Sequence, residues 1–266
     1  MKVKEKTMNR ITKLFQEKPN NVLNIYFTAG FPNLNDTTTV LEALQASGAD
    51  IAEIGMPYSD PVADGETIQQ SNQVALDNGM SLKVLFQQLE GIRAKVSIPI
   101  ILMGYINPVV QFGIENFCKK CQEVGVDGLI LPDLPMDEYY EEYKPIFDQY
   151  GLLNIFLITP QTTESRIRRI DEISDGFIYM VSSASVTGGT SGITDTMEAY
   201  FNRVNAMNLR NPRLIGFGIK DNATFTKASQ YAAGAIIGSQ FIRVLQNSSD
   251  NTLYNDIVEY VKSVKG

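Results

Sequence analysis

Short apolar segments recur along the chain, and each is followed by a stretch with apolar residues on one side of a helical repeat. A short apolar run bounded by turn residues is typical of a buried strand, and the longer repeat indicates an amphipathic helix. The expected strands are Leu23–Phe27, Ile51–Ile54, Ile98–Met103, Gly128–Leu131, Leu152–Ile158, Phe177–Val181, Leu214–Phe217 and Ala235–Ile237. The expected helices are Asn35–Gly48, Ser81–Val96, Ile114–Val124, Met136–Tyr150, Thr163–Ile173, Thr196–Met207 and Asn222–Ala232.

This alternation predicts the fold class. Strands that alternate with helices favour a parallel sheet, and eight such units in 266 residues match the size of a (β/α)8 TIM barrel. A doubly wound open sheet is the alternative. No Pro/Gly/Ser-rich linker divides the chain, so we expect residues 1–266 to form a single α/β domain. The charged, moderately amphipathic segment Met1–Phe15 predicts an extra helix before the first strand.

Two carboxylates stand out in and after the second expected strand. Glu53 interrupts an otherwise apolar strand, where an unpaired carboxylate is costly to bury. Asp64 lies in the segment Gly55–Gly79, which we interpret as a long loop at the carboxyl end of the barrel, where active sites of this fold lie. The chain has no histidine, so acid–base catalysis would fall to such carboxylates. Alternatively, Glu53 is a satisfied buried carboxylate and Asp64 a turn residue.

Composition narrows the classes of function. The net charge of −7 disfavours a non-specific nucleic-acid binder. No apolar run approaches the roughly 18 residues of a membrane span, and the first residues lack the apolar core of a secretory signal, so we expect a cytoplasmic protein without membrane contact. Cys118 and Cys121, with no histidine and no second pair, cannot form a four-ligand zinc site within one chain. We interpret both as structural cysteines and expect no metal.

Glycine-rich segments at three later strand ends predict a phosphate site. They are Val186–Gly192, Gly216–Ile219 and Gly238–Ser239. In TIM barrels a phosphate often binds at the loops after the seventh and eighth strands, beside the N-terminus of a short helix. Backbone N–H groups can hold the anion there without basic side chains, which is compatible with an acidic protein. The segment 187–192 also has the composition of a lid.

These motifs together resemble the tryptophan synthase alpha subunit family from about Asn9 to about Leu245. The most specific match runs from Glu53 to Gly65, Glu-Ile-Gly-Met-Pro-Tyr-Ser-Asp-Pro-Val-Ala-Asp-Gly, and is similar to the active-site signature of that family. Supporting matches lie at nearly every strand end: Phe27–Gly30, Gly104–Pro108, Pro132–Pro135, Val186–Gly188, Gly216–Ile219 and Gly238–Ser239.

The resemblance implies a lyase that splits indole-3-glycerol phosphate into indole and D-glyceraldehyde 3-phosphate in tryptophan biosynthesis. It implies a partner, the beta subunit, in an alpha2beta2 assembly. The pyridoxal phosphate is then held by the beta subunit, and this chain has no cofactor of its own. Two other possibilities stay open: a barrel that binds the ligand and activates its partner without turnover, and a lyase that works alone.

The resemblance also assigns roles to residues of this chain. Glu53 and Asp64 are the catalytic pair. The substrate-binding residues are Tyr179, Tyr26, Met103, Ile106 and Thr187; the phosphate-binding residues are Gly188, Gly218, Gly238 and Ser239; and the residues facing the partner are Asp60, Asn107 and Pro108. Ser183 and Ser185, just before Val186, depart from the family pattern, which bears on lid closure rather than on the type of reaction.

Overall fold

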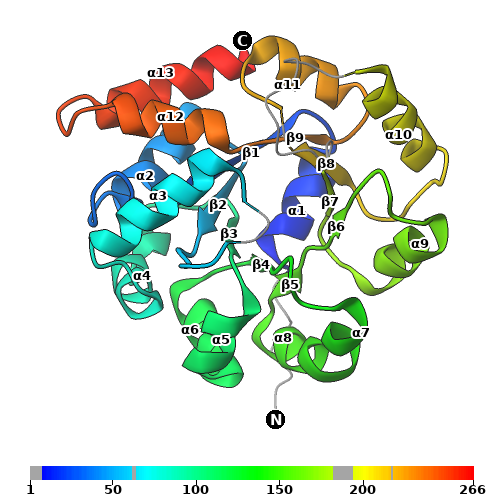
Figure 1. Cartoon of the computed structure of the whole chain (residues 1–266), viewed down its shortest axis with the longest axis horizontal. Helices are drawn as coiled ribbons and strands as arrows, with labels where there is room; N and C mark the ends of the chain where they lie inside the picture. The colour runs from blue at the N-terminus through cyan, green and yellow to red at the C-terminus, as the bar shows by residue number, and fades with distance from the viewer. Residues whose placement is uncertain (1–7, 62–63, 182–193, 217) are drawn as a thin grey trace.

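All the strands belong to one parallel sheet that curls into a barrel (Figure 1). The computed structural model describes residues 8–61, 64–181, 194–216 and 218–266. The strand order is β5-β4-β3-β2-β1-β9-β8-β7-β6. The strands are β1 (Val22–Thr28), β2 (Ile51–Gly55), β3 (Ile100–Met103), β4 (Gly128–Ile130), β5 (Leu153–Asn154), β6 (Leu157–Ile158), β7 (Ile178–Val181), β8 (Arg213–Gly216) and β9 (Gly234–Ile237).

The two ends of this sheet are halves of one segment. The expected fifth strand, Leu152–Ile158, is split into β5, which pairs with β4, and β6, which pairs with β7. Between them, the Ile155 N–H donates to the Leu129 carbonyl, and the Phe156 carbonyl accepts from the Tyr179 N–H. The sheet therefore closes on itself. The predicted eight-stranded barrel is confirmed, and the open doubly wound sheet is wrong.

Helices surround this barrel and follow most of the predicted amphipathic stretches (Figure 1). The α-helices are α1 (Arg10–Glu17), α2 (Thr37–Ser47), α3 (Glu66–Asp77), α4 (Leu82–Leu89), α5 (Ile106–Phe112), α6 (Ile114–Val124), α7 (Met136–Glu138), α8 (Lys144–Tyr150), α9 (Glu164–Ile173), α10 (Asp195–Asn205), α11 (Asn222–Ser229), α12 (Ser239–Asn247) and α13 (Leu253–Lys265). A 3-10 turn, η1 (Ile92–Ala94), follows α4, and a π-helical turn, η2 (Tyr139–Tyr143), joins α7 to α8.

One expectation about this region is wrong. The segment Gly55–Gly79 is not a continuous loop, because α3 occupies half of it. Its buried residues Ile68, Asn72 and Ala75 recur at helical spacing, while three glutamines and other polar residues between them mask the pattern in the sequence. The true loop is the short stretch between β2 and α3, and it carries Asp64. Helices α5, α12 and α13 were also not anticipated.

Side chains alternate between two cores along each strand. The even-numbered residues of β1, from Val22 to Thr28, point into the barrel, and the odd-numbered ones face the helices. The interior is filled by aliphatic and aromatic side chains, namely Val22, Ile51, Ile101, Ile130, Ile155, Phe177, Tyr179, Val181, Leu214 and Ile236. In β2, Ile51, Glu53 and Gly55 take the inward positions, so Glu53 projects into the barrel.

The N-terminal helix α1 closes the bottom of the barrel. Ile11 is fully buried and belongs to the interior core, and the Phe15 ring lies 5.9 Å from that of Phe177. Asn9 caps the helix through the Ile11 N–H and also donates to the Asp127 and Gly151 carbonyls. The predicted extra helix is therefore present, but it spans Arg10–Glu17, and residues 1–7 lie outside the described part. Its position leaves the carboxyl end of the barrel as the open end.

A buried carboxylate joins α1 to the strands at this bottom end. Asp127, 3% exposed, forms ion pairs of 2.8 Å with Arg10 and 2.7 Å with Arg93, and it accepts from the Ile100 N–H at 2.9 Å. Arg93 in turn donates to the carbonyls of Val96, Ile98 and Gly125. The network connects three successive β/α units on the face opposite the carboxyl strand ends.

Two smaller findings bear on the sequence predictions. Cys118 and Cys121 are both free thiols buried in the layer between barrel and helices, and burial raises the pKa of each. They are therefore structural, as predicted. Within the described ranges, no helix is long and apolar enough to cross a membrane.

We predict that Asp127→Ala destabilises the chain by about 3 kcal/mol, because it strips a half-buried Arg93 of its charged partner and the Ile100 N–H of its acceptor. Urea unfolding followed by circular dichroism measures this. Glu123→Ala, which removes an exposed ion pair with Lys120, is the matched control and should leave the midpoint unchanged. Equal midpoints for the two variants would contradict the assigned role of the network.

Candidate active site

Glu53 is a carboxyl group enclosed in the upper barrel. Its side chain is 1% exposed and lies in register with Tyr26 on the neighbouring strand. Oε2 accepts a hydrogen bond of 2.6 Å from Nδ2 of Asn24, whereas Oε1 has no partner among the described residues. Burial raises the pKa of Glu53 to about 8, against the opposing effect of the Asn24 hydrogen bond. Near pH 7 the side chain is therefore mostly the neutral acid.

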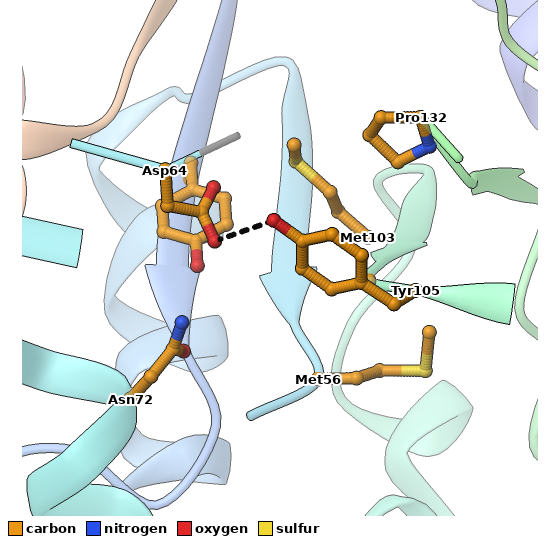
Figure 2. Close-up of a pocket in the computed structure, with 8 residues that line it drawn as sticks. Met56, Asp64, Asn72, Met103, Tyr105 and Pro132 are labelled. Carbon is orange, nitrogen blue, oxygen red and sulfur yellow. Dashed lines mark hydrogen bonds between the residues drawn. The ribbon is translucent and has the colours of Figure 1, made fainter. Parts of the chain in front are cut away.

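Asp64 approaches the same region from the loop between β2 and α3. Figure 2 shows the Tyr105 hydroxyl and the Asp64 carboxylate pointing toward one another, with Oη donating to Oδ2 at 3.4 Å. Partial burial raises the pKa of Asp64, and the Tyr105 hydrogen bond opposes that rise. The charge of Asp64 contributes to the raised pKa of Glu53, which places the two carboxyls within electrostatic reach of one another.

A narrow pocket of about 10 Å³ opens between these residues and the ends of β1 to β4 (Figure 2). The space is about the size of one water molecule, so an aromatic ligand must displace the side chains around it. The lining combines two thioethers and two phenol rings with one carboxylate: Tyr26, Met56, Asp64, Asn72, Met103, Gly104, Tyr105 and Pro132. Flexible methionines accommodate such a displacement readily.

Two buried tyrosines complete the upper interior, and each depends on a glycine of the next strand. A Cβ at Gly55 would overlap the Tyr26 hydroxyl, and one at Gly216 would overlap the Tyr179 hydroxyl. Glycine at these inward positions therefore makes room for both rings. Burial raises the pKa of Tyr26 and of Tyr179, and the nearby charges of Glu53 and Asp64 add to both shifts, so both phenols stay neutral.

The hydroxyl of Tyr26 starts a chain of hydrogen bonds that leads away from Glu53. Ser71 donates to the Ile68 carbonyl at 2.8 Å, so its oxygen accepts from Thr28 at 2.7 Å. Thr28 has then used its only proton, and it accepts from Tyr26 at 3.4 Å. The proton of Tyr26 is thus directed at α3 rather than at the carboxyl group.

Of the residues predicted to bind phosphate, Gly218, Gly238 and Ser239 lie just after the carboxyl ends of β8 and β9, which are hydrogen-bonded neighbours. Gly238 is the N-cap of α12, and Ser239 is its first residue. Gly218 is exposed with a φ of +77°, and a Cβ there would meet no atom of the described residues within 4 Å. A Cβ at Gly238 would lie 3.7 Å from Tyr26, so this helix N-terminus borders the pocket side of β1. Thr187, Gly188, Ser183 and Ser185 lie outside the described residues.

Ile106 and the residues predicted to face a partner lie on the rim. Ile106 is half-buried and packs against the core between barrel and helices, and it is not among the residues that line the pocket. Its N–H donates to both carboxylate oxygens of Asp133. Asp60 is exposed and accepts from the Ser59 hydroxyl at 2.7 Å. Asn107 is exposed, and Pro108 beside it is half-buried.

A row of contacts connects this rim to the pocket. Asn107 donates to the Tyr58 hydroxyl at 3.5 Å, and the Tyr58 ring lies 5.1 Å from that of Tyr105. Tyr105 donates in turn to Asp64. The exposed edge of α5 is therefore two side chains away from a carboxylate of the site.

Several residues of the site escape sequence reasoning. Asn24, Met56, Asn72 and Tyr105 were not anticipated. The signal for Asn24 was available, because it is a polar residue at an inward position of an otherwise apolar strand, two positions before Tyr26. Asn72 and Met56 carried no such signal, because their positions depend on where α3 begins and how the loop before it turns.

Comparison with known proteins identifies the family to which this arrangement belongs. The model of the tryptophan synthase alpha chain family matches residues 12–265. The chain belongs to this family. The tryptophan synthase alpha chain of Christiangramia forsetii is 58% identical over 259 residues, which cover 97% of this chain and 99% of that relative. That of Flavobacterium johnsoniae is 56% identical over 252 residues, covering 95% of this chain and 99% of the relative.

Solved structures of tryptophan synthase show the same fold. The alpha subunit from Legionella pneumophila has a TM-score of 0.87 at 29% identity, with 97% of this chain and 98% of that chain covered. A chain of the aminoacrylate-bound tryptophan synthase from M. tuberculosis has a TM-score of 0.84 at 27% identity, again with 97% and 98% covered. The barrel is therefore that of the tryptophan synthase alpha family over nearly its full length.

The burial of Glu53 has a consequence for stability. Its pKa is about 8 in the folded chain against 4.5 for an unperturbed glutamate, so the folded state holds a proton that the unfolded state has released between these values. We predict that this group makes the free energy of unfolding fall by about 1.4 kcal/mol per pH unit as the pH rises from about 5 to about 8.

Urea unfolding of the wild type and of Glu53→Gln across this range measures the effect. Because glutamine cannot ionise, the variant should lose less stability than the wild type as the pH rises and should be the more stable of the two at pH 8. Parallel pH profiles would show that Glu53 does not titrate with a raised pKa.

Proposed function

We propose that this alpha chain cleaves indole-3-glycerol phosphate by a retro-aldol reaction to indole and D-glyceraldehyde 3-phosphate, with Glu53 and Asp64 as the catalytic pair. Membership in the tryptophan synthase alpha family supports the reaction. The single observation that carries the assignment of residues is the pair of carboxyls at the open end of the barrel, one of them buried and neutral near pH 7. Residues 1–266 act as one domain in this proposal.

The reaction needs one group that first gives and then takes a proton. Protonation at C3 of the indole ring turns the ring into a leaving group. Removal of the proton from the glycerol hydroxyl next to C3 then lets the carbon–carbon bond break, giving the aldehyde and restoring the aromatic ring. A carboxyl group whose pKa is close to the working pH serves both steps. Glu53 fits this role because its pKa is about 8.

Asp64 would act on the other end of the ring. Protonation of C3 places positive charge on the indole nitrogen, and a carboxylate that accepts the N–H stabilises that charge. Asp64 lies above the pocket, where the Tyr105 hydrogen bond favours its ionised form. Tyr26 and Met103 line the same pocket, and Tyr179 closes the interior beside it, so all three are proposed to contact the ring or the glycerol chain.

The phosphate would bind at the ends of β8 and β9. The N-terminus of α12 offers backbone N–H groups at Gly238 and Ser239, and Gly218 leaves open space beside it. The family resemblance adds Gly188 to the phosphate-binding residues and Thr187 to the residues that bind the substrate. Glu53 lies in register with Tyr26, and Gly238 borders Tyr26, so the phosphate and the reacting carbon fall on the same side of the barrel mouth.

The family assembles with a beta subunit into an alpha2beta2 complex, and the pyridoxal phosphate belongs to the beta subunit. We propose the exposed rim formed by Asp60, Asn107 and Pro108 as the partner-facing edge, because contacts run from Asn107 through Tyr58 and Tyr105 to Asp64. A biosynthetic enzyme of this kind is assigned to the cytoplasm.

We predict that Glu53→Gln abolishes cleavage while the fold and phosphate binding persist, because glutamine keeps the shape of the side chain but cannot move a proton. The expected loss of kcat is at least about 1,000-fold. Indole release measures turnover, and titration with glyceraldehyde 3-phosphate measures binding. Glu259→Gln, on the exposed face of α13, is the same substitution outside the barrel and should leave turnover unaltered.

The proposed function itself is tested by indole release from indole-3-glycerol phosphate, with the purified chain alone and with a beta subunit added. We expect weak turnover alone and a strong rise with the partner. Fast release by the isolated chain would identify a lyase that works alone. Ligand binding without release under either condition would identify a barrel that only activates its partner.

A further inference from the structure

Asn24 is a buried polar residue that the proposed function does not use. This residue is 0% exposed, sits at an inward position of β1, and donates to Oε2 of Glu53 at 2.6 Å. A fully buried amide in a barrel interior that is otherwise aliphatic and aromatic costs free energy unless it serves a partner. Its own oxygen, Oδ1, has no partner among the described residues, so its one hydrogen bond is the one to Glu53.

We infer that Asn24 is a positioning residue that divides the work of the two Glu53 oxygens: it holds Oε2 as a permanent acceptor and leaves Oε1 as the oxygen that gives and takes the proton. The inference deepens the proposed function and rests on it. Asn24 itself exchanges no proton and does not belong to the pocket lining.

The amide of Asn24 and the carboxyl group of Glu53 differ in what each can donate. The carbonyl oxygen of a neutral carboxyl group is a better acceptor than its hydroxyl oxygen, so the oxygen that accepts the Asn24 N–H takes the carbonyl role. When Glu53 is the neutral acid, this preference places its proton on Oε1. Oε1 has no partner among the described residues and is the oxygen left to reach a ligand. After the proton has moved to C3 of the ring, the same N–H still stabilises the carboxylate, and Oε1 is ready to take the hydroxyl proton.

The neighbours of Glu53 do not offer a substitute for this donor. The titratable groups that face it among the described residues are Asp64 from the loop after β2, Tyr26 on β1 and Tyr179 on β7. Asp64 disfavours the ionised form of Glu53, and Tyr26 directs its proton to Thr28. Ile101 lies beside Glu53 on β3 and is apolar. The Asn24 N–H is therefore the neutral donor that stabilises the ionised form of Glu53.

Two substitutions test the inference. Asn24→Leu removes the donor with little change in volume, and Asn24→Asp keeps the shape in case leucine does not fold. We expect both to raise the pKa of Glu53 by about one unit, the first through loss of the hydrogen bond and the second through a like charge. Asn154→Leu is the matched control, because Asn154 is equally buried on β5 but faces the helices.

The primary readout is the titration of the Glu53 side-chain carbonyl carbon by NMR with labelled glutamate, assigned by comparison with Glu53→Gln. It needs no substrate, so it decides the inference even if indole release fails and the proposed function falls. The second readout is the pH dependence of cleavage. The pH at which kcat falls on the alkaline side should rise together with the titration midpoint of Glu53. In addition, kcat at pH 7 should fall about tenfold while KM changes less than twofold, because a misplaced oxygen slows proton transfer without weakening binding.

The control should titrate and turn over as the wild type does. A titration midpoint and a kcat in Asn24→Leu or Asn24→Asp that match the wild type would overturn the inference. A fall in kcat without any shift of the Glu53 midpoint or of the pH limb would also overturn it, because that result would indicate a general loss of packing rather than control of Glu53.

Discussion

The site depends on one physical constraint, which is that a single carboxyl group is held inside a barrel that excludes water. In water a glutamate is ionised at neutral pH and has no proton to give. Inside the barrel the low polarity of the surroundings favours the neutral form, and the pKa of Glu53 rises to about 8. Its two polar neighbours act in opposite directions, since Asn24 favours the ionised form and the charge of Asp64 disfavours it.

This constraint determines which residues surround Glu53. A large ring beside the carboxyl excludes water, and the rings of Tyr26 and Tyr179 fit at their inward positions because the next strand carries a glycine there. Gly55 and Gly216 provide that space for Tyr26 and Tyr179. At the bottom of the barrel, α1 contributes Ile11 to the interior core, and the ion pairs of Asp127 fasten this end. Asp64, Gly218 and Gly238 lie at the opposite, carboxyl end of the barrel.

Much of this arrangement followed from sequence patterns, and the exceptions have physical reasons. All eight apolar runs became barrel strands, because a strand buried on both faces needs an unbroken apolar sequence. The same reasoning identified Glu53, since a charge within such a run is anomalous. It missed α3, where glutamines cover the exposed face and only a narrow stripe is buried. It missed α12 and α13 too, although α12 supplies the helix N-terminus at Gly238 on which the phosphate proposal rests.

Two of the residues that the sequence did not reveal, Asn24 and Tyr105, share one property, which is that they act on a carboxyl group brought close by the barrel. Asn24 and Glu53 are 29 positions apart in the chain, and Tyr105 and Asp64 are 41 apart. Each pair joins a carboxyl to a neutral donor on an adjacent strand or loop, and each donor favours the ionised form that burial opposes. A parallel barrel produces such pairs because it sets consecutive β/α units side by side. At both carboxyls, burial is opposed by a single neutral donor. This balance therefore depends on how neighbouring β/α units are aligned in the barrel, and not on a motif within one segment.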